Sequence, residues 1–306
     1  MKAFVRIDSV DQEVSMEDVP IPKYQSNEVL IKVEAFGVGI HDRYFIPSDA
    51  KFPYVIGLEG TGVIQEIGSE FTNFKVDDRV IFTTVMQANG GSWAEYAVAN
   101  QDVLISLPAN LTFAQGATVP IAGKTALECM RELDIKEGES LFIAGASGAI
   151  GTLVIQLAHA KGVRISASAS AKNQDYMKTL GADQTVDYSD PDWINKVKNW
   201  SDGGVDKVLA IQPDTEIKSI QVVKDGGLLI TVSGYNSSIS SQRGIDIRQM
   251  GHELFTTTEL KELVNSISIG EINIVIEKEF PFDQALEALL KTETRKARGK
   301  VVVNVN

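Results

Sequence analysis

Apolar and polar residues alternate along several short stretches in the first third of the chain. The alternation is clear in residues 27–39 (NEVLIKVEAFGVG), 60–68 (GTGVIQEIG) and 77–85 (DDRVIFTTV), and residues 90–99 (GGSWAEYAVA) follow a Gly-Gly turn. Successive side chains of a strand point to opposite faces, so this period of two predicts short strands with one buried face. Helical periodicity is slight between them. The pattern predicts a compact, barrel-like β domain.

Beyond about residue 120 the pattern changes to strands that alternate with helices, which predicts a parallel sheet with helices on both faces. The predicted strands are residues 139–145, 163–169, 184–188, 205–211 and 228–234, and the predicted helices are residues 149–162, 172–181, 191–200 and 215–227. In the tail we predict helices over 257–271 and 283–293 and strands over 273–280 and 299–305. Periodicity alone leaves open whether this tail extends the parallel sheet or returns to the first domain.

The junction between the first strand and the first helix of this region is rich in glycine. Residues 143–151 read IAGASGAIG, and within them 146–151 match a dinucleotide-binding fingerprint with alanine in its first position. Gly148 has no Cβ, so a pyrophosphate can lie against the backbone, and Gly151 allows the helix to pack closely on the strand. The free N–H groups at the helix start attract phosphate. We therefore predict cofactor contacts from Ala146, Ser147, Gly148, Ala149, Ile150 and Gly151.

The second strand of the region indicates which dinucleotide binds. An NAD-binding unit places an acidic residue about 20 residues after the glycines, where it accepts hydrogen bonds from the ribose. Residues 163–174 (VRISASASAKNQ) contain no acid. They contain instead Ser168, Ser170 and Lys172, which can donate hydrogen bonds to a 2′-phosphate. The sequence therefore predicts NADP(H), although each of these residues taken singly also fits an ordinary polar loop.

Composition and charge restrict the partners. The chain is 43% hydrophobic and 23% charged, which suits a soluble globular protein with a sizeable core. Its net charge of −12 argues against nucleic acid and anionic membranes, because both are polyanions. A single cysteine, Cys129, allows neither an internal disulfide nor a Cys-rich zinc site. With no apolar run near the roughly 18 residues of a membrane span, we expect a soluble cytoplasmic protein.

The order of several motifs resembles the zinc-free quinone oxidoreductase, or zeta-crystallin-like, branch of the medium-chain dehydrogenase/reductase family over nearly the whole chain. The motifs are IGLEGTGVIQEIG, FKVDDRVIF, GGSWAEYAVA, VPIAGKTALECM, GESLFIAGASGAIG, LGADQTVDY and ARGKVVVNV. The resemblance implies an α/β protein with a GroES-like substrate domain over 1–118, an NADP(H)-binding Rossmann domain over 119–255, and a segment over 256–306 that returns to the substrate domain. It also implies a homodimer.

The resemblance bears on zinc as well. Zinc-dependent members of the family carry a Cys-His pair and a Gly-His-Glu where this chain has Gly39, Ile40 and Leu58, and only Glu59 is retained. The cysteine-rich lobe of those members is also missing. Because a catalytic zinc needs three protein ligands, we predict that no metal is bound. His41 is offset by one from the ligand position and fits an ordinary polar residue equally well.

Other site residues follow from the resemblance. Asp42 and Tyr44 stand where the family borders its substrate slot, with Asp42 expected to organise the loop. The arginine and asparagine usual in this region are missing, which suggests a wider slot. The further cofactor contacts implied are Thr125, Tyr188, Ser233, Gly234 and Arg295, although Tyr188 and Arg295 fit ordinary surface residues equally well. Cys129, His159 and His252 are expected to be structural.

These inferences predict an oxidoreductase. A zinc-free site suits quinones, which accept reducing equivalents readily, so we expect an NADPH-dependent quinone reductase. Two alternatives remain: an NADPH-dependent reductase of α,β-unsaturated carbonyls, such as alkenals and enones, and a non-enzymatic NADPH-binding protein. Alcohol oxidation is disfavoured because it generally needs a Lewis acid for the charge on oxygen.

Overall fold

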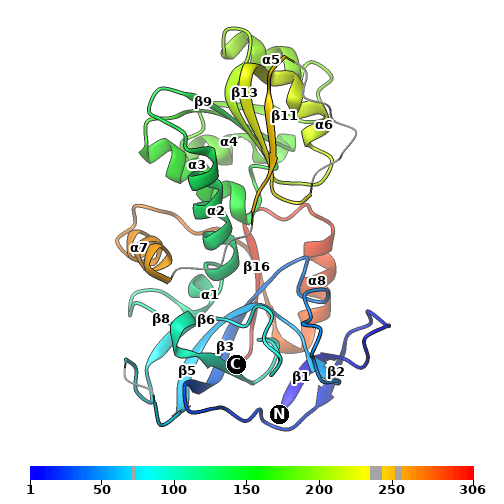
Figure 1. Cartoon of the computed structure of the whole chain (residues 1–306), viewed down its shortest axis with the longest axis vertical. Coiled ribbons are helices and arrows are strands. Elements are labelled where there is room, and N and C mark those ends of the chain that lie inside the picture. The colour runs from blue at the N-terminus through cyan, green and yellow to red at the C-terminus, as the bar shows by residue number, and fades with distance from the viewer. Residues whose placement is uncertain (71–72, 235–242, 252–256) are drawn as a thin grey trace. The chain divides into compact units, whose positions relative to one another are not determined.

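The chain divides into two compact units, each formed around its own sheet. The computed structural model describes residues 1–70, 73–234, 243–251 and 257–306 (Figure 1). Unit 1 is Met1–Ile121 together with Thr256–Asn306, and unit 2 is Ala122–Phe255. Unit 1 is therefore assembled from both ends of the chain, whereas unit 2 is one continuous stretch.

Seven of the described strands form the main sheet of unit 1. Their order is β15-β16-β3-β5-β6-β8, with β7 also paired to β3. Strand β3 is buried along most of its length, and β16 pairs with it antiparallel, so the last strand of the chain lies in the first unit's sheet. The strands are β3 (Glu28–Val38), β5 (Glu59–Ile67), β6 (Arg79–Thr83), β7 (Tyr96–Asn100), β8 (Ile105–Ser106), β15 (Ile276–Pro281) and β16 (Lys300–Asn304).

A smaller antiparallel sheet and several helices complete unit 1. The sheet has the order β2-β1-β4 and consists of β1 (Lys2–Arg6), β2 (Ser15–Asp18) and β4 (Tyr54–Val55). The α-helices that lie wholly in this unit are α1 (Phe113–Gly116), α7 (Thr257–Ser268) and α8 (Ala285–Glu293), and the 3-10 helices are η1 (Gln101–Val103) and η4 (Phe282–Gln284). Trp93 is fully buried and stacks on Phe36 of β3 with 4.9 Å between ring centroids. This stacking helps anchor the loops around Trp93 to the core.

Six described strands form the parallel sheet of unit 2, in the order β11-β10-β9-β12-β13-β14. The strands are β9 (Ser140–Ala144), β10 (Arg164–Ala169), β11 (Gln184–Asp187), β12 (Val205–Ala210), β13 (Val223–Thr231) and β14 (Asp246–Gln249). The helices of this region are α2 (Pro120–Leu133), α3 (Ala149–Ala160), η2 (Ala171–Asn173), α4 (Gln174–Thr179), α5 (Trp193–Trp200), α6 (Glu216–Ser219) and η3 (Ile220–Val222). When these six strands are numbered in the order in which they occur along the chain, their order across the sheet is 3-2-1-4-5-6, which is that of a Rossmann fold.

This strand order determines where a ligand can bind. The chain runs from β9 outward to β11 and then returns past β9 to β12, so the sheet has a switch point between β9 and β12. Right-handed crossovers in opposite directions place helices on both faces of the sheet. Phe142 of β9 stacks on Trp193 of α5 at 5.2 Å, which fixes α5 against one of these faces. Open α/β sheets bind ligands beyond the carboxyl ends of the strands at such a switch point.

In unit 2 one local prediction was wrong and one strand was missed. The helix predicted over residues 215–227 ends at Ser219, continues as a 3-10 turn to Val222, and gives way to β13 at Val223. Val222 and Val223 are β-branched and fully buried, and Val223 pairs with Val205, so burial in the sheet prevails over helical spacing. Strand β14 was not predicted, because its sequence DIRQ contains one apolar residue and lies at the sheet edge.

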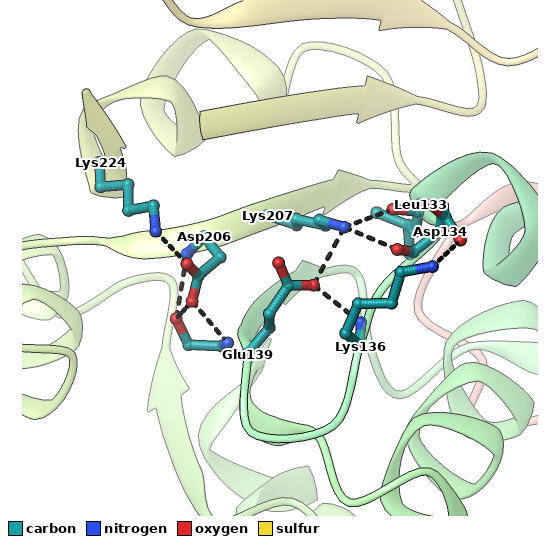
Figure 2. Close-up of polar contacts among 8 residues, drawn as sticks. Leu133, Asp134, Lys136, Glu139, Asp206, Lys207 and Lys224 are labelled. Carbon is teal, nitrogen blue, oxygen red and sulfur yellow. Dashed lines mark hydrogen bonds and ion pairs between the residues drawn. The ribbon is translucent and has the colours of Figure 1, made fainter. Parts of the chain in front are cut away.

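The amino ends of the parallel strands are joined by charged side chains (Figure 2). Asp206, at the start of β12, accepts hydrogen bonds from the backbone N–H of Ser140 at 2.8 Å and from its hydroxyl at 2.6 Å, and it is ion-paired with Lys224 of β13. Lys207 donates to the carbonyl oxygens of Leu133 and Asp134 at 2.8 and 2.9 Å. These contacts join β9, β12 and β13 at the amino ends of the strands, whereas the switch-point site lies beyond their carboxyl ends.

Replacing Asp206 with Asn tests this network. Burial raises the pKa of Asp206, but the hydrogen bonds from Lys224 and Ser140 outweigh that effect and lower the pKa to about 2. Because the folded pKa lies below the unfolded value of about 3.9, the carboxylate stabilises the fold above about pH 4 and this stabilisation is lost as pH falls toward 2. We expect Asp206→Asn to lower the free energy of unfolding by about 1 kcal/mol at pH 7 and by less near pH 3.

Urea unfolding of both proteins between pH 3 and 7 measures this difference. Asp175→Asn is the matched control, because the Asp175 side chain is fully exposed on α4. Parallel pH profiles for wild type and Asp206→Asn would show that the charge of Asp206 contributes nothing to stability.

Candidate functional site

The glycine-rich junction lies at the switch point of the unit 2 sheet. Strand β9 ends at Ala144, Gly145 turns the chain with a φ of +81°, and α3 begins at Ala149. The backbone N–H of Ala146 donates to the carbonyl oxygen of Ser168 at 3.0 Å, which fixes the turn to β10. Gly148 is the N-cap of α3, and no side chain caps this helix. The first N–H groups of α3 are therefore available to a ligand that binds beside the glycine-rich junction.

The two fingerprint glycines differ in their surroundings. A Cβ built on Gly148 would meet nothing closer than the carbonyl oxygen of Gly145 at 3.7 Å. A Cβ on Gly151 would lie 2.5 Å from the carbonyl oxygen of Ala146 and 2.6 Å from its Cα. Space above Gly148 thus remains open to a ligand, whereas the space at Gly151 is filled by the chain's own backbone. This arrangement fits a pyrophosphate that approaches at Gly148.

The loop after β10 is the second part of this site. Ser170 directly follows the strand and is half-buried, and Lys172 is exposed on η2. Ser168 lies within β10 and is 4% exposed, so it is the least accessible of the three predicted donors. Asn173 was not singled out in the sequence, yet its Nδ2 atom donates to the Ser147 hydroxyl at 3.0 Å. The structure thereby joins this loop to the glycine-rich junction.

The remaining predicted cofactor residues are spread over several elements. Tyr188 follows β11 and is 57% exposed, and the Ser233 hydroxyl, beyond the end of β13, donates to the carbonyl oxygen of Ile211 at 2.6 Å. Gly234 has a φ of +117°, and Thr125 is buried in α2. Arg295 is exposed and belongs to unit 1, with a φ of +56°. Their contacts with a cofactor stay predictions.

Two of the three residues expected to be structural, Cys129 and His159, lie in the part of the chain that the structure describes. Cys129 is fully buried with its Sγ 3.5 Å from the Sδ of Met250, and burial raises the pKa of its thiol to about 12. A thiol held in its protonated form is a poor nucleophile. His159 is exposed near the end of α3. His252 lies outside the described residues.

The predicted substrate-slot residues lie in the loop after β3. Asp42 is 2% exposed, and its Oδ2 atom accepts hydrogen bonds from the Gly39 N–H at 2.8 Å and from Trp93 Nε1 at 3.2 Å. Through Trp93 the loop is tied to the aromatic core of unit 1. Asp42 therefore organises this loop from beneath.

Burial has a large effect on the titration of Asp42. It raises the pKa of this carboxyl to about 7, against the opposing effects of the Lys300 charge and the Gly39 N–H, while the charge of Glu59 raises it further. A carboxyl in this range carries its proton for part of the physiological pH range. The loop is thus held by a group whose charge changes near neutrality.

Tyr44 has an accessible ring, in contrast to Asp42. It is 43% exposed, and the Arg43 guanidinium lies 5.9 Å from its ring centroid. Arg43 is ion-paired with Glu293 of α8 at 2.9 Å. His41 stacks on Phe45 with 4.8 Å between ring centroids. Tyr44 and Phe45 therefore present aromatic surface on the outside of the loop.

Beneath this loop lies an ion pair that sequence inspection did not identify. Glu59, at the start of β5, is 1% exposed and is paired with Lys300, the first residue of β16, which is 7% exposed. The other carboxylate oxygen of Glu59 accepts a hydrogen bond from the backbone N–H of Ile121 at 2.7 Å. A Cβ on Gly37 would lie 2.5 Å from the carbonyl oxygen of Ala117 and 2.7 Å from Glu59 Oε1, so glycine is needed there.

Two searches over the described residues had negative results. No group of three or more His, Cys, Asp or Glu side chains is placed to hold a metal ion in the part of the chain that the structure describes. Across those same residues, no helix has the length and hydropathy needed to cross a membrane.

Two family models match this chain, one in each half of its sequence. Residues 25–109 match the alcohol dehydrogenase GroES-like domain and residues 180–303 match the zinc-binding dehydrogenase domain. An NADPH-dependent alkenal/one oxidoreductase of Arabidopsis thaliana is 30% identical over 99% of this chain and 79% of its own length. The quinone oxidoreductase of Coxiella burnetii is 28% identical, with a TM-score of 0.88 over 100% of this chain and 99% of its own.

This chain belongs to the quinone oxidoreductase branch of the medium-chain dehydrogenase/reductase family. A mycobacterial protein solved as a complex with NADPH is also similar, with 26% identity and a TM-score of 0.86 over 100% of both chains. The predicted family and the predicted fold class, a Rossmann sheet with a GroES-like β domain, are confirmed. The chain is accordingly an oxidoreductase of this family.

Alanine at the two fingerprint glycines of this quinone oxidoreductase homologue should have separable effects. Gly148 has an extended backbone with a φ of −79°, so Gly148→Ala fits without strain and should change the free energy of unfolding by less than about 1 kcal/mol. Gly151→Ala forces its Cβ against Ala146 and should cost on the order of 1–3 kcal/mol. Thermal and urea unfolding of the two variants measure this difference, and equal stabilities would contradict the assigned roles.

Asp42→Asn should alter how stability depends on pH. The pKa of Asp42 is higher in the folded protein than in the unfolded chain. Between about pH 4 and pH 7 the unfolded chain has released this proton and the folded protein still binds it, so the wild type loses stability as pH rises through this range. Asn accepts the same two hydrogen bonds without ionising. We expect the stability of the wild type relative to Asp42→Asn to fall by on the order of 2 kcal/mol between pH 5 and pH 8. Asp18→Asn on the exposed strand β2 is the control, and an unchanged difference across this range would refute the assignment.

Proposed function

We propose that this oxidoreductase is an NADPH-dependent quinone reductase that works without zinc. The observation that carries the proposal is the switch-point site of unit 2: a helix without a side-chain cap, opened by Gly148, beside a loop of hydroxyl and ammonium donors with no acid at the end of β10. The mycobacterial NADPH complex and the NADPH-dependent plant relative support this choice of cofactor.

The residues of this site fit a dinucleotide phosphate. The space that a Cβ would occupy at Gly148 is open, and the N–H groups at the start of α3 supply donors and a positive dipole end for the pyrophosphate. Ser170 and Lys172 would hold the 2′-phosphate, with Ser168, Tyr188 and Arg295 as further proposed contacts. Thr125, Ser233 and Gly234 would border the nicotinamide, which supplies the reducing equivalents when NADPH is bound.

Unit 1 would provide the acceptor site. The exposed ring of Tyr44 can stack on a planar acceptor, and its hydroxyl can donate to a carbonyl oxygen. Asp42 would act by holding the loop in place. Gly39, Ile40 and Leu58 stand at the positions where zinc-dependent relatives have ligands, and none of them has a side chain that binds zinc. Quinones suit such a site, because they accept reducing equivalents without a Lewis acid.

A second candidate function is reduction of α,β-unsaturated carbonyls. It is favoured by the 30% identity to the plant alkenal/one oxidoreductase. Enones are conjugated acceptors like quinones, so the same aromatic loop could serve them. They differ in needing a proton at carbon after hydride transfer, which makes the choice of acceptor testable.

The proposal also covers the domains, the oligomeric state and the location of the protein. Residues 1–118 are proposed as the substrate domain, residues 119–255 as the NADP(H)-binding domain, and residues 256–306 as the segment that serves the substrate domain. We further propose a homodimer, as the family resemblance implies, and a cytoplasmic location, which the single cysteine favours. The non-enzymatic NADPH-binding role is the outcome expected if no acceptor supports turnover.

The deciding experiment follows NADPH absorbance with an ortho-quinone and an alkenal in parallel. We expect turnover of the quinone, a preference for NADPH over NADH, and no loss of rate with a zinc chelator. Gly148→Ala should keep the fold and weaken NADPH binding at least tenfold, because its Cβ occupies the pyrophosphate position. Turnover of the alkenal alone would move the function to enone reduction, and loss of rate with chelator would refute a zinc-free site.

A further inference from the structure

Asn173 joins the two loops of the proposed cofactor site. It lies at the end of η2, is 4% exposed, and its Nδ2 atom donates to the Ser147 hydroxyl oxygen at 3.0 Å and approaches that of Ser170 at 3.5 Å. Ser147 belongs to the turn after β9, and Ser170 directly follows β10. One buried amide thus contacts a hydroxyl from each loop.

The direction of these hydrogen bonds matters for an anionic ligand. A serine hydroxyl has one hydrogen to donate and an oxygen that accepts. Because Asn173 donates to the Ser147 oxygen, the Ser147 hydrogen is not used on Asn173 and can be donated elsewhere. An anion such as phosphate accepts hydrogen bonds and cannot donate to a serine oxygen when fully ionised. Asn173 therefore sets Ser147 as a donor.

The backbone around Asn173 keeps its amide in position. Its N–H donates to the Ser170 carbonyl oxygen at 2.9 Å, and Gln174 donates from Nε2 to the carbonyl oxygen of Ala169 at 3.1 Å. The turn is thereby fixed to the end of β10 by hydrogen bonds on both sides of the amide. A donor held in advance loses little entropy when a ligand binds.

We propose that Asn173 is a positioning residue for NADPH, which fixes the Ser147 and Ser170 hydroxyls so that their hydrogens are offered to the phosphates of the cofactor. This inference rests on the proposed function, and it adds a residue that acts through others. Asn173 acts at the hydroxyl oxygens, and the two serines make the contacts with phosphate.

A double-mutant cycle in the full-length protein tests the coupling. We expect Asn173→Ala and Ser147→Ala each to weaken NADPH binding about tenfold, measured by titration of NADPH fluorescence. The double variant should bind NADPH at most about threefold more weakly than Ser147→Ala does, because Asn173 acts partly through that serine. The melting temperature of each variant is measured as well, because a variant that loses its fold would bind NADPH weakly whether or not Ser147 is present.

Asn173→Asp keeps the size of the side chain and reverses the hydrogen bond. The carboxylate accepts the Ser147 hydrogen, so NADPH binding should weaken more than in Asn173→Ala. Asn195→Asp on the exposed face of α5 adds the same charge outside the site and serves as the control. This variant also keeps the test valid if the alanine variant fails to fold.

The outcomes separate the two proposals. If the wild type does not bind NADPH, both the proposed function and this inference fail. If the wild type binds NADPH, and Asn173→Ala and Asn173→Asp both bind it as tightly as the wild type does, the proposed function stands and the role of Asn173 is refuted. Additive losses in the double variant would also refute it, because they would show that Asn173 does not act through Ser147.

Discussion

A charge pair buried in unit 1 determines much of the geometry around the loop that carries Asp42 and Tyr44. Glu59 and Lys300 are both withdrawn from water, and such charges are tolerated in a protein interior only when each is closely paired. The pair joins β5 to β16, and Glu59 also holds the backbone of Ile121. Gly37 leaves room for the Glu59 side chain, and the two charges act in opposite directions on the pKa of Asp42, which burial raises. Removing either partner would leave the other charge buried and unbalanced.

The core strands of unit 2 could be predicted from the sequence because each is a short apolar run bounded by turn residues. This signal is local, and it remains valid whatever the rest of the chain does. The tail was different, since apolar strands such as residues 299–305 can be buried in either sheet. Periodicity therefore left the sheet of this strand open, and only the family resemblance predicted its return to unit 1, where Val301–Asn304 pair antiparallel with β3. Strand β14 and the early start of β13 were missed because neighbouring strands, and not their own sequences, make them extended.

The candidate site likewise combines features that the local sequence encodes with features that only the fold determines. The glycine fingerprint could be read from sequence because turn, close approach and helix start all occur within a few residues. The partners of these residues could not. Trp93 donates to Asp42 across 51 positions and Asn173 to Ser147 across 26, and no spacing rule connects them. The backbone geometry of a cofactor site is encoded locally, whereas the side chains that orient it come from wherever the fold brings a donor.

The split composition of unit 1 has a consequence for how the chain acquires its structure during synthesis. Unit 2 is continuous, so all its described strands have been made before the ribosome adds the second part of unit 1, which begins at Thr256. Domains generally fold as units once their sequence has emerged. Unit 1 must wait for β16, and until then the edge of β3 that pairs with β16 has exposed backbone groups. The nascent protein therefore passes through a stage with one sheet complete and the other open, which is the stage most exposed to misassociation.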